Sequence, residues 1–247
     1  MALSPIVVVP ARLKASRLPE KPLAEINGRP MIAHVLERAR AADAGPVLVA
    51  CDDPRIAEAA RVAGGEAVHT REDHPSGSDR VHEAVEARDP DGGYDVVVNV
   101  QGDLPAIDPA VIRRVLAPLE ADPETAIATL VAPVTTEAER DDPAVVKAAV
   151  AFADGASIGR ALYFSRATIP WGDGPRYHHI GLYAYRREAL RRFVSLAPGV
   201  LEQREKLEQL RALEAGMRLD AAFVDTVPLG VDTPAHLDRA RTLLAGN

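Results

Sequence analysis

The feature that most constrains the fold is an alternation, in the first half of the chain, of short apolar runs with stretches of helical spacing. Ile32, Val35, Leu36 and Ala39 recur as on one face of a helix, and Pro54 suits the first turn of the next one. Strands that alternate with helices predict βαβ units and a mainly parallel, doubly wound α/β sheet, covered on both faces. The expected strands are 6–9, 47–50, 66–69, 96–100 and 127–131.

The second half of the chain has a different pattern. Residues 160–165 and 180–185 are typical of strands, and a Pro/Gly-rich stretch, 170–175, separates them. Residues 201–215 predict one long helix, and Thr233-Pro234 predicts the start of a last one. We therefore expect a single domain over residues 1–247, with a small inserted α+β sub-domain at approximately 150–215.

Composition excludes several classes of protein. The net charge of -7, from 29 basic and 36 acidic residues, argues against a nucleic-acid partner. The single cysteine, Cys51, rules out an intrachain disulfide and suits a reducing compartment. The N-terminal residues show neither a basic leader nor a long apolar stretch, so we expect a cytoplasmic protein with no membrane span.

A basic loop follows the first expected strand. It begins at Pro10-Ala11 and places four cations before residue 22, in a chain that is otherwise acidic. It lacks the P-loop and dinucleotide-binding glycine patterns. A solvated surface loop is the alternative, but ligands bind at the carboxyl ends of strands in such sheets, which favours binding of a triphosphate. The cations are Arg12, Lys14, Arg17 and Lys21.

Asp103 follows the expected strand 96–100 through Gln101-Gly102. A carboxylate at a strand end, facing a triphosphate loop, is suited to hold Mg²⁺, which takes one or two carboxylates together with phosphate oxygens. An aspartate that merely forms a turn is the alternative. No Ser/His/Asp or Cys nucleophile stands out, so the residues alone predict a magnesium-dependent nucleotidyltransferase that works by direct transfer.

Nine segments together resemble the 3-deoxy-manno-octulosonate (Kdo) cytidylyltransferases, also called CMP-Kdo synthetases. They occur in the family's order, and they cover nearly the whole chain. The segments are 9–12, 16–23, 27–32, 76–80, 99–103, 161–166, 179–183, 207–211 and 230–234.

This resemblance implies transfer of CMP from CTP to the anomeric hydroxyl of Kdo, giving CMP-Kdo for lipopolysaccharide biosynthesis, in a homodimer. It implies Asp232 as the second Mg²⁺ ligand beside Asp103, and the insert as a sugar-binding or dimerisation element. The implied catalytic residues are Arg12, Lys21, Asp103 and Asp232. The implied nucleotide-binding residues are Pro10, Ala11, Arg12, Arg17, Lys21, Ser76, Gly77 and Arg80. The implied sugar-binding residues are Gln101, Arg166, His179, Tyr183, Glu208 and Gln209.

One residue departs from the family pattern, which has Glu after the metal-binding Asp where this chain has Leu104. We interpret Leu104 as a tolerated change beside the ligand. Three alternatives stay open at this point: a cytidylyltransferase for a related acid sugar such as amino-Kdo or a sialic acid, a glycosyltransferase that uses a nucleotide sugar, and a nucleotide-binding protein without activity.

Overall fold

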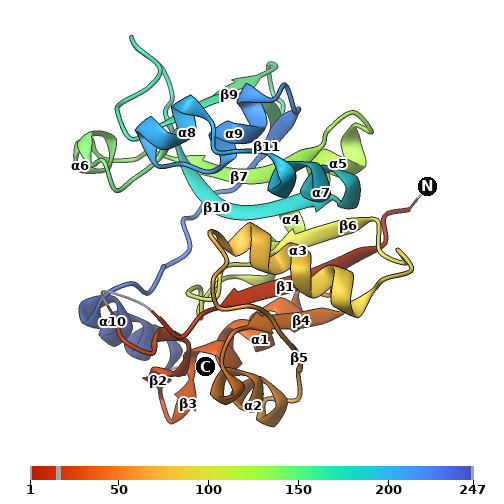
Figure 1. Ribbon diagram of the computed structural model, residues 1–247. Helices are drawn as coiled ribbons and strands as arrows, with labels where there is room; N and C mark the ends of the chain where they lie inside the picture. Colours follow the sequence, from red (N-terminus) through yellow and green to blue (C-terminus); the bar gives the residue numbers. More distant parts are fainter. Residues whose placement is uncertain (1, 15–17, 246–247) are drawn as a thin grey trace. The chain divides into compact units, whose positions relative to one another are not determined.

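The computed structural model describes residues 2–14 and 18–245 (Figure 1). The chain forms two compact units. The first consists of Leu3–Arg113 together with the C-terminal segment that begins at Pro228, and the second is Arg114–Val227. The first unit is thus built from both ends of the sequence.

The sheet of the first unit is parallel throughout. Strand β1 (Pro5–Ala11) pairs with β4 (Val47–Cys51) on one side and with β6 (Val96–Asn99) on the other. Strand β5 (Glu66–His69) pairs with β4 and extends the sheet. The carboxyl ends of all four strands therefore lie at one edge, which is where ligands bind in open sheets of this kind.

The central strands are buried from end to end. Ile6, Val7, Val8 and Val9 of β1 are at most 2% exposed, and β6 is equally buried. Helix α3 contacts all four strands and lies across them in Figure 1, whereas α1 contacts β1 and β4. Coverage by helices explains why these strands are continuous apolar runs instead of alternating ones.

Short elements complete the first unit. They are η1 (Lys21–Leu23), β2 (Glu25–Ile26), β3 (Arg29–Pro30), α1 (Met31–Ala41), α2 (Pro54–Val62), α3 (Gly77–Arg88), α4 (Pro109–Arg114), which reaches the unit boundary, and α10 (Pro234–Leu244).

Side-chain caps fix where the helices of this unit begin. Asp53 accepts a hydrogen bond from the backbone N–H of Arg55 at 2.8 Å and starts α2. Thr233 accepts one from the N–H of His236 at 3.2 Å and starts α10, with proline in the first turn. Both helix starts predicted from Asp-Pro and Thr-Pro are confirmed.

The second unit contains a mixed sheet of five strands in the order β10-β7-β11-β9-β8. Strands β7 and β11 are parallel, and the remaining pairs are antiparallel. The strands are β7 (Ile127–Pro133), β8 (Lys147–Phe152), β9 (Ile158–Ser165), β10 (Tyr177–Arg186) and β11 (Leu219–Phe223). Its helices are α5 (Ala117–Ala121), α6 (Glu137–Asp141), α7 (Arg187–Ser195), α8 (Val200–Glu205) and α9 (Gln209–Glu214).

The prediction of one helix over 201–215 is wrong. Lys206 adopts the left-handed conformation, with φ 58° and ψ 45°, and this ends α8 before α9 begins. The two short helices are joined by an ion pair between Glu202 and Arg211, with oxygen–nitrogen distances of 2.6 and 2.8 Å. Glu202 also accepts the N–H of Gly199, so one carboxylate fixes the start of α8 and its packing on α9.

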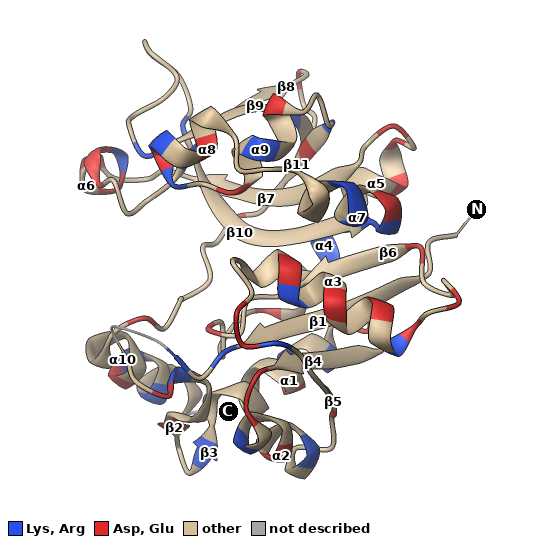
Figure 2. Ribbon diagram, viewed as in Figure 1, with Lys and Arg blue, Asp and Glu red and all other residues tan. Residues whose placement is uncertain are grey.

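The α/β class with a mainly parallel sheet is confirmed by the paired strands. The segment expected as an insert, 150–215, falls wholly inside the second unit, which also includes β7, β8 and β11. Its role as a separate sub-domain stays a prediction. Charges of both signs are interspersed on α3 and α7 (Figure 2), an arrangement more typical of solvated helices than of a nucleic-acid surface. No helix in the part of the chain described is long and apolar enough to cross a membrane.

Candidate active site

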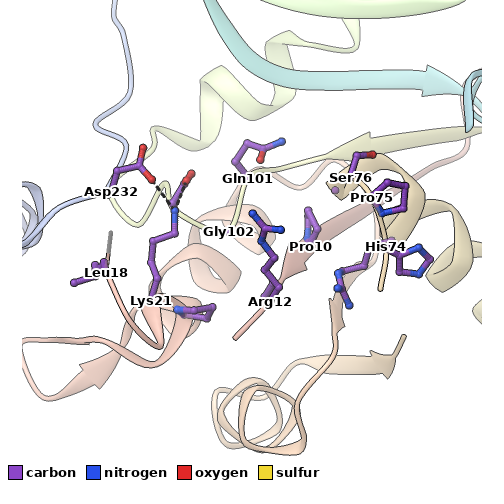
Figure 3. A pocket seen from close by; sticks show the side chains of 15 residues that line it. Pro10, Arg12, Leu18, Lys21, His74, Pro75, Ser76, Gln101, Gly102 and Asp232 are labelled. Carbon is purple, nitrogen blue, oxygen red and sulfur yellow. Dashed lines mark hydrogen bonds and ion pairs between the residues drawn. The ribbon is translucent and has the colours of Figure 1, made fainter. Parts of the chain in front are cut away.

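A pocket of about 290 Å³ opens at the carboxyl edge of the parallel sheet in the first unit (Figure 3). It is lined by the end of β1, the segment around η1, the start of α3, the loop after β6 and the residue that precedes the cap of α10. The lining residues are Pro10, Ala11, Arg12, Leu18, Lys21, Pro22, His74, Pro75, Ser76, Gly77, Arg80, Gln101, Gly102, Asp103 and Asp232.

Two carboxylates meet on one lysine in this pocket. The Nζ atom of Lys21 lies 2.8 Å from Oδ2 of Asp103 and 3.0 Å from Oδ1 of Asp232. Figure 3 shows the side chains of Lys21 and Asp232 converging from different segments of the chain. Residues that were expected as ligands on sequence grounds are thus brought together at one point.

Backbone contacts hold this centre in place. The carbonyl oxygen of Asp103 accepts a hydrogen bond from the N–H of Val231 at 2.9 Å. The loop after β6 is thereby tied to the C-terminal segment, directly beside Asp232. Because the link runs through backbone atoms, both carboxylate side chains stay available for the pocket.

The environment of Lys21 favours its charged form. Burial alone would lower its pKa, but the charges and hydrogen bonds of Asp103 and Asp232 outweigh burial and raise the pKa above the ordinary 10.5. Lys21 is therefore a permanent cation at neutral pH. In this geometry it neutralises carboxylates that would otherwise repel each other.

The basic loop is only partly directed at the pocket. The exposed side chain of Arg12 lines it, and no carboxylate partner for Arg12 occurs among the described residues. Lys14 instead faces Glu72 at 3.4 Å on the surface. Arg17, expected to bind nucleotide, lies outside the described residues. Of the cations in the described part of the basic loop, Arg12 and Lys21 are thus the two that line the pocket.

The first turn of α3 forms another wall of the pocket. Ser76 caps the helix, accepting the N–H of Asp79 at 3.3 Å and donating its hydroxyl to the Asp79 carboxylate at 2.6 Å. Gly77 is the first helical residue and lies beside Pro10. The start of this 12-residue helix therefore faces the cavity, and the positive end of its dipole is suited to oxygen atoms of a nucleotide.

Arg80 lines the pocket but is almost fully buried, at 3% exposure. Its guanidinium donates to Oγ1 of Thr70 at 2.5 Å and to Oδ2 of Asp52 at 3.2 Å. The sequence predicted a nucleotide contact for Arg80. The structure shows its guanidinium engaged with Thr70 and Asp52, next to the loop that carries Arg12, and the nucleotide contact stays a prediction.

Gly102 allows the loop after β6 to approach β1 closely. A Cβ atom at this position would lie 2.7 Å from the carbonyl oxygen of Pro10, closer than real Cβ atoms come. The neighbouring side chains of Gln101 and Asp103 both line the pocket. Glycine at position 102 is therefore what lets these two side chains and the basic loop share one cavity.

Leu104 does not face the pocket. Its side chain is buried, at 8% exposure, and packs toward the backbone of Gly230. It is not among the residues that line the cavity. The hydrophobic residue at this position thus supports the packing of the C-terminal segment behind Asp103, which agrees with its interpretation as a tolerated change.

The donor set at this centre fits a magnesium ion. No cluster of three or more His, Cys, Asp or Glu residues poised for a metal occurs within residues 2–14 and 18–245. Mg²⁺, however, commonly uses only one or two carboxylates, with water and phosphate filling its other positions. Asp103 and Asp232 supply two, and Lys21 lies between them as a cation in the place where a metal would be attracted.

A cysteine nucleophile can be excluded. Burial and the nearby charge of Asp52 together raise the pKa of the Cys51 thiol to about 11. Cys51 is fully buried and is not part of the pocket. This agrees with the expectation of direct transfer.

Of the predicted sugar-binding residues, Gln101 lines the pocket of the first unit, and the other five lie in the second unit. There, His179 is buried, with Nε2 2.9 Å from Oγ1 of Thr129 and Nδ1 3.5 Å from Nε2 of Gln209. The Thr129 hydroxyl lies within hydrogen-bonding distance of the backbone carbonyls of Ile180 and Leu182. If it donates to a carbonyl, it accepts from the ring, which makes His179 a neutral imidazole protonated at Nε2.

The pKa of His179 supports that assignment. Burial and, to a smaller extent, the neighbouring His178 lower this pKa to about 3. The buried phenol of Tyr183 has a pKa raised well above its ordinary value by the same desolvation. Both side chains are therefore uncharged hydrogen-bonding groups over the whole physiological range.

A break in strand pairing brings these two rings together. Residues four apart in a regular strand are about 13 Å apart, yet the ring centroids of His179 and Tyr183 are separated by 5.5 Å. The pairing of β10 with β7 shifts register between Ile180 and Tyr183, and such a bulge bends a strand. The two rings therefore contact each other although they are four residues apart in the sequence.

Arg166 and Glu208 lie beside the two short helices. The guanidinium of Arg166 donates to the carbonyl oxygens of Glu205 at 2.8 Å and Pro143 at 3.0 Å. Glu208 is half-buried and precedes α9, whereas Gln209, the first residue of that helix, is buried. The corner between α8 and α9, and not the face of one long helix, therefore positions this pair.

Several lining residues had not been predicted. Leu18, Pro22, His74 and Pro75 line the pocket, and His74 bonds through Nε2 to Glu83. Asp52, which holds Arg80, was also missed as a functional residue. A histidine in a polar loop and an aspartate before a helix cap carry no distinctive sequence signal. The one available indication was their position shortly after the carboxyl ends of predicted strands.

The sequence profile of a family described as "Cytidylyltransferase" matches residues 6–219. The chain is 68% identical to the 3-deoxy-manno-octulosonate cytidylyltransferase of Rhodospirillum centenum, over 98% of this chain and 93% of that one. It is 63% identical to the enzyme of the same name from Paramagnetospirillum magneticum, over 98% of each chain.

Solved structures agree with the sequence relatives. A CMP:2-keto-3-deoxy-manno-octonic acid synthetase complexed with CTP is 40% identical, with a TM-score of 0.90 over 98% of this chain and 99% of that one. A nucleotidyl transferase from Methanothermobacter thermautotroptrophicus is 18% identical, with a TM-score of 0.61 over 99% of each chain, and shares the fold.

Proposed function

Because this chain belongs to the 3-deoxy-manno-octulosonate cytidylyltransferase family, we propose that its pocket transfers CMP from CTP to the anomeric hydroxyl of Kdo, with Mg²⁺ held by Asp103 and Asp232. The chain is accordingly a nucleotidyltransferase with CTP and Kdo as substrates. The observation that carries the assignment of the site is the convergence of Lys21 on both carboxylates within a cavity that also holds Arg12.

The phosphates of CTP bind to the cations of the pocket. The exposed guanidinium of Arg12 offers paired donors to phosphate oxygens, and Lys21 offers a point charge beside the carboxylates. Arg17, from the same loop, is proposed as a further phosphate ligand on the basis of the family resemblance. The cap of α3, with Ser76 and Gly77, supplies backbone amides to the ribose or base.

Asp103 and Asp232 would hold Mg²⁺ through their carboxylate oxygens. When bound, such an ion polarises the phosphate and lowers the pKa of the attacking hydroxyl. The two carboxylates come from segments fixed to each other by the hydrogen bond from Val231 to Asp103, so their spacing is set before substrate arrives.

Transfer is direct. The anomeric oxygen of Kdo forms a bond to the α-phosphorus, the bond from that phosphorus to the bridging oxygen breaks, and pyrophosphate leaves. The hydroxyl proton passes to solvent. Arg12 and Lys21 neutralise charge on the leaving pyrophosphate, and no covalent bond to the protein is needed.

Recognition of the acid sugar is assigned to the polar residues of the second unit and to Gln101. Neutral His179 and Tyr183 are suited to sugar hydroxyls, because their hydrogen bonds do not change with pH near neutrality. Glu208 and Gln209 are proposed for further hydroxyls. Arg166 is proposed for the Kdo carboxylate, which would require part of its guanidinium to leave the carbonyl oxygens that it now contacts.

Assembly and cellular role follow from the family resemblance alone. We propose a cytoplasmic homodimer whose product, CMP-Kdo, is used in lipopolysaccharide biosynthesis, with the second unit as the dimerisation element. Sedimentation of the purified protein tests the dimer directly, and a monomer at all concentrations would contradict it.

The activity is tested by measuring pyrophosphate release from each nucleotide triphosphate crossed with each acid sugar, in the presence of Mg²⁺. Release with CTP and Kdo is expected to exceed release with sialic acid or amino-Kdo. A preference for one of those sugars would reassign the substrate, and no release with any sugar would refute the activity. Asp103→Asn should reduce turnover at least about 100-fold, as expected for loss of a transition-state charge contact, while circular dichroism stays unchanged.

A further inference from the structure

Asp52 lies directly after β4, beside the basic loop, and its carboxylate joins two parts of the site. Oδ1 accepts the backbone N–H of Leu13 at 3.0 Å, and Oδ2 accepts from the guanidinium of Arg80 at 3.2 Å. The side chains of Asp52 and Arg80 are 7% and 3% exposed. Asp52 does not line the pocket, so it acts on a ligand only through the residues it holds.

The partner of Asp52 is itself fixed. The other branch of the Arg80 guanidinium donates to Oγ1 of Thr70, which donates in turn to the backbone carbonyl of Cys51 at the end of β4. The backbone N–H of Thr70 binds the same carbonyl oxygen at 2.8 Å. Arg80 thus spans from α3 to the ends of β4 and β5, a rigid support for one oxygen of Asp52.

Leu13 is the residue next to Arg12. Its N–H is held by Asp52 just where β1 has ended and the chain turns into the basic loop. Within residues 2–14 and 18–245, no side-chain hydrogen bond or ion pair orients Arg12. The direction of its side chain is therefore set by the backbone, and that backbone is anchored by Asp52.

We propose that Asp52 is a positioning residue for nucleotide binding: it fixes the turn after Arg12 so that the arginine faces the triphosphate. The idea rests on the function proposed above. It predicts a selective effect, in which loss of the Asp52 carboxylate weakens binding of CTP and leaves binding of the acid sugar unchanged. Arg80 supports the same turn from inside, which accounts for its burial in a nucleotide pocket.

Different substitutions of Asp52 can test the contacts of its two carboxylate oxygens separately. Asp52→Ala removes both contacts. Asp52→Asn keeps an oxygen that can accept the Leu13 N–H, but it presents an amide to Arg80 or loses the ionic contact. We expect the KM for CTP to rise about 10- to 100-fold in Asp52→Ala, the effect of losing a hydrogen bond to a charged acceptor, and less in Asp52→Asn. The KM for Kdo should stay within about twofold of the wild-type value.

Asp53 provides a matched control. It is the adjacent aspartate and also accepts a backbone N–H, from Arg55 at 2.8 Å. Its carboxylate caps α2 and, among the described residues, bonds to Arg55 and not to Arg12 or Leu13. Asp53→Ala should lower the melting temperature by loss of the cap while leaving the KM for CTP unchanged. A rise in the KM for CTP in both variants, in proportion to lost stability, would overturn a specific role for Asp52.

A second measurement does not depend on turnover. Amide hydrogen exchange at Leu13 should be slow in the wild-type protein and in Asp53→Ala, and markedly faster in folded Asp52→Ala. If the protein proved inactive on CTP and Kdo, this result would still stand, so failure of the proposed function and failure of the positioning role can be told apart. Unchanged exchange at Leu13 in Asp52→Ala would refute the proposal. If Asp52→Ala does not fold, Asp52→Asn replaces it with a smaller expected acceleration of Leu13 exchange, because a neutral amide oxygen accepts a hydrogen bond more weakly than a carboxylate. Exchange at the wild-type rate in Asp52→Asn would then refute the proposal.

Discussion

Replacing Lys21 by methionine should make the nucleotide-free protein a better binder of divalent metal. The Nζ atom of Lys21 lies 2.8 Å from Asp103 and 3.0 Å from Asp232, at the position to which both carboxylates would attract a metal ion. A metal ion that arrives without nucleotide must compete with this cation. Methionine has a similar length and shape but no charge, so it removes the competitor while filling most of the same space.

The size of the gain in metal affinity depends on how far the three charged side chains are exposed to solvent. Two unit charges about 4 Å apart interact by roughly 4 kcal/mol at an effective dielectric constant near 20, but exposed pairs contribute only about 0.2–1 kcal/mol. The side chains of Lys21 and Asp103 are 20% and 26% exposed, and that of Asp232 is 39% exposed, so the second contact is discounted for solvent screening. A net gain of about 1–2 kcal/mol remains, equivalent to roughly 5- to 30-fold tighter metal binding.

Titration with Mn²⁺, followed by electron paramagnetic resonance in the absence of CTP, measures this directly. Lys14→Met is the control, because Lys14 also pairs with a carboxylate but lies on the surface away from the pocket. We expect tighter Mn²⁺ binding in Lys21→Met only, together with a large loss of CMP transfer. Equal or weaker Mn²⁺ binding in Lys21→Met would show that Asp103 and Asp232 do not form the metal site.

Two further predictions concern stability. Gly102→Ala should destabilise the fold by about 1–3 kcal/mol and reduce activity, because its Cβ would lie 2.7 Å from the Pro10 carbonyl oxygen. Gly77→Ala should not destabilise the fold, because the nearest atom to its Cβ would lie at 3.7 Å. Equal melting temperatures for the two variants would contradict this prediction. Burial lowers the pKa of His179 in the folded protein to about 3, so the unfolded chain takes up the proton first as the pH falls. The free energy of unfolding should therefore fall as the pH drops from about 6.5 toward 3, by up to about 1.4 kcal/mol per pH unit. Urea titrations at pH 7.5, 6 and 5 should show a shallower fall for His179→Asn, and identical slopes would mean that another group controls the pH dependence.

The parallel strands could be predicted because burial on both faces leaves a simple signal. Every residue of 6–9 and 96–98 is apolar, and such runs need no knowledge of their neighbours. Strands β8 and β11 were missed because each contains a buried charge. Lys147 of β8 donates to the carbonyl oxygens of Asp142 and Val145, and Oδ2 of Asp220 in β11 accepts from Thr125 and Arg218. Those partners are set by tertiary structure, so the sequence pattern resembles that of an exposed segment.

The candidate site likewise contains some contacts that could be predicted from the sequence and others that could not. Lys21 and Asp103 could be expected to meet, because each follows the carboxyl end of a neighbouring parallel strand. The burial of Arg80 could not be foreseen, because it depends on Asp52, which lies 28 residues earlier and whose sequence context indicates only a helix start. Arginines in polar motifs are ordinarily exposed, and only the assembled strand ends supply a buried partner.

The pairing of Lys21 with Asp232 spans 211 residues of chain, whereas its pairing with Asp103 spans 82. During synthesis on the ribosome, the nucleotide loop, α3 and the first carboxylate emerge early, and the whole second unit is made before the second carboxylate appears. Chains fold domain by domain as they emerge. A nascent or C-terminally shortened chain would therefore present its basic loop with half of the proposed metal-binding centre, and chemical competence would arrive only with the last segment made.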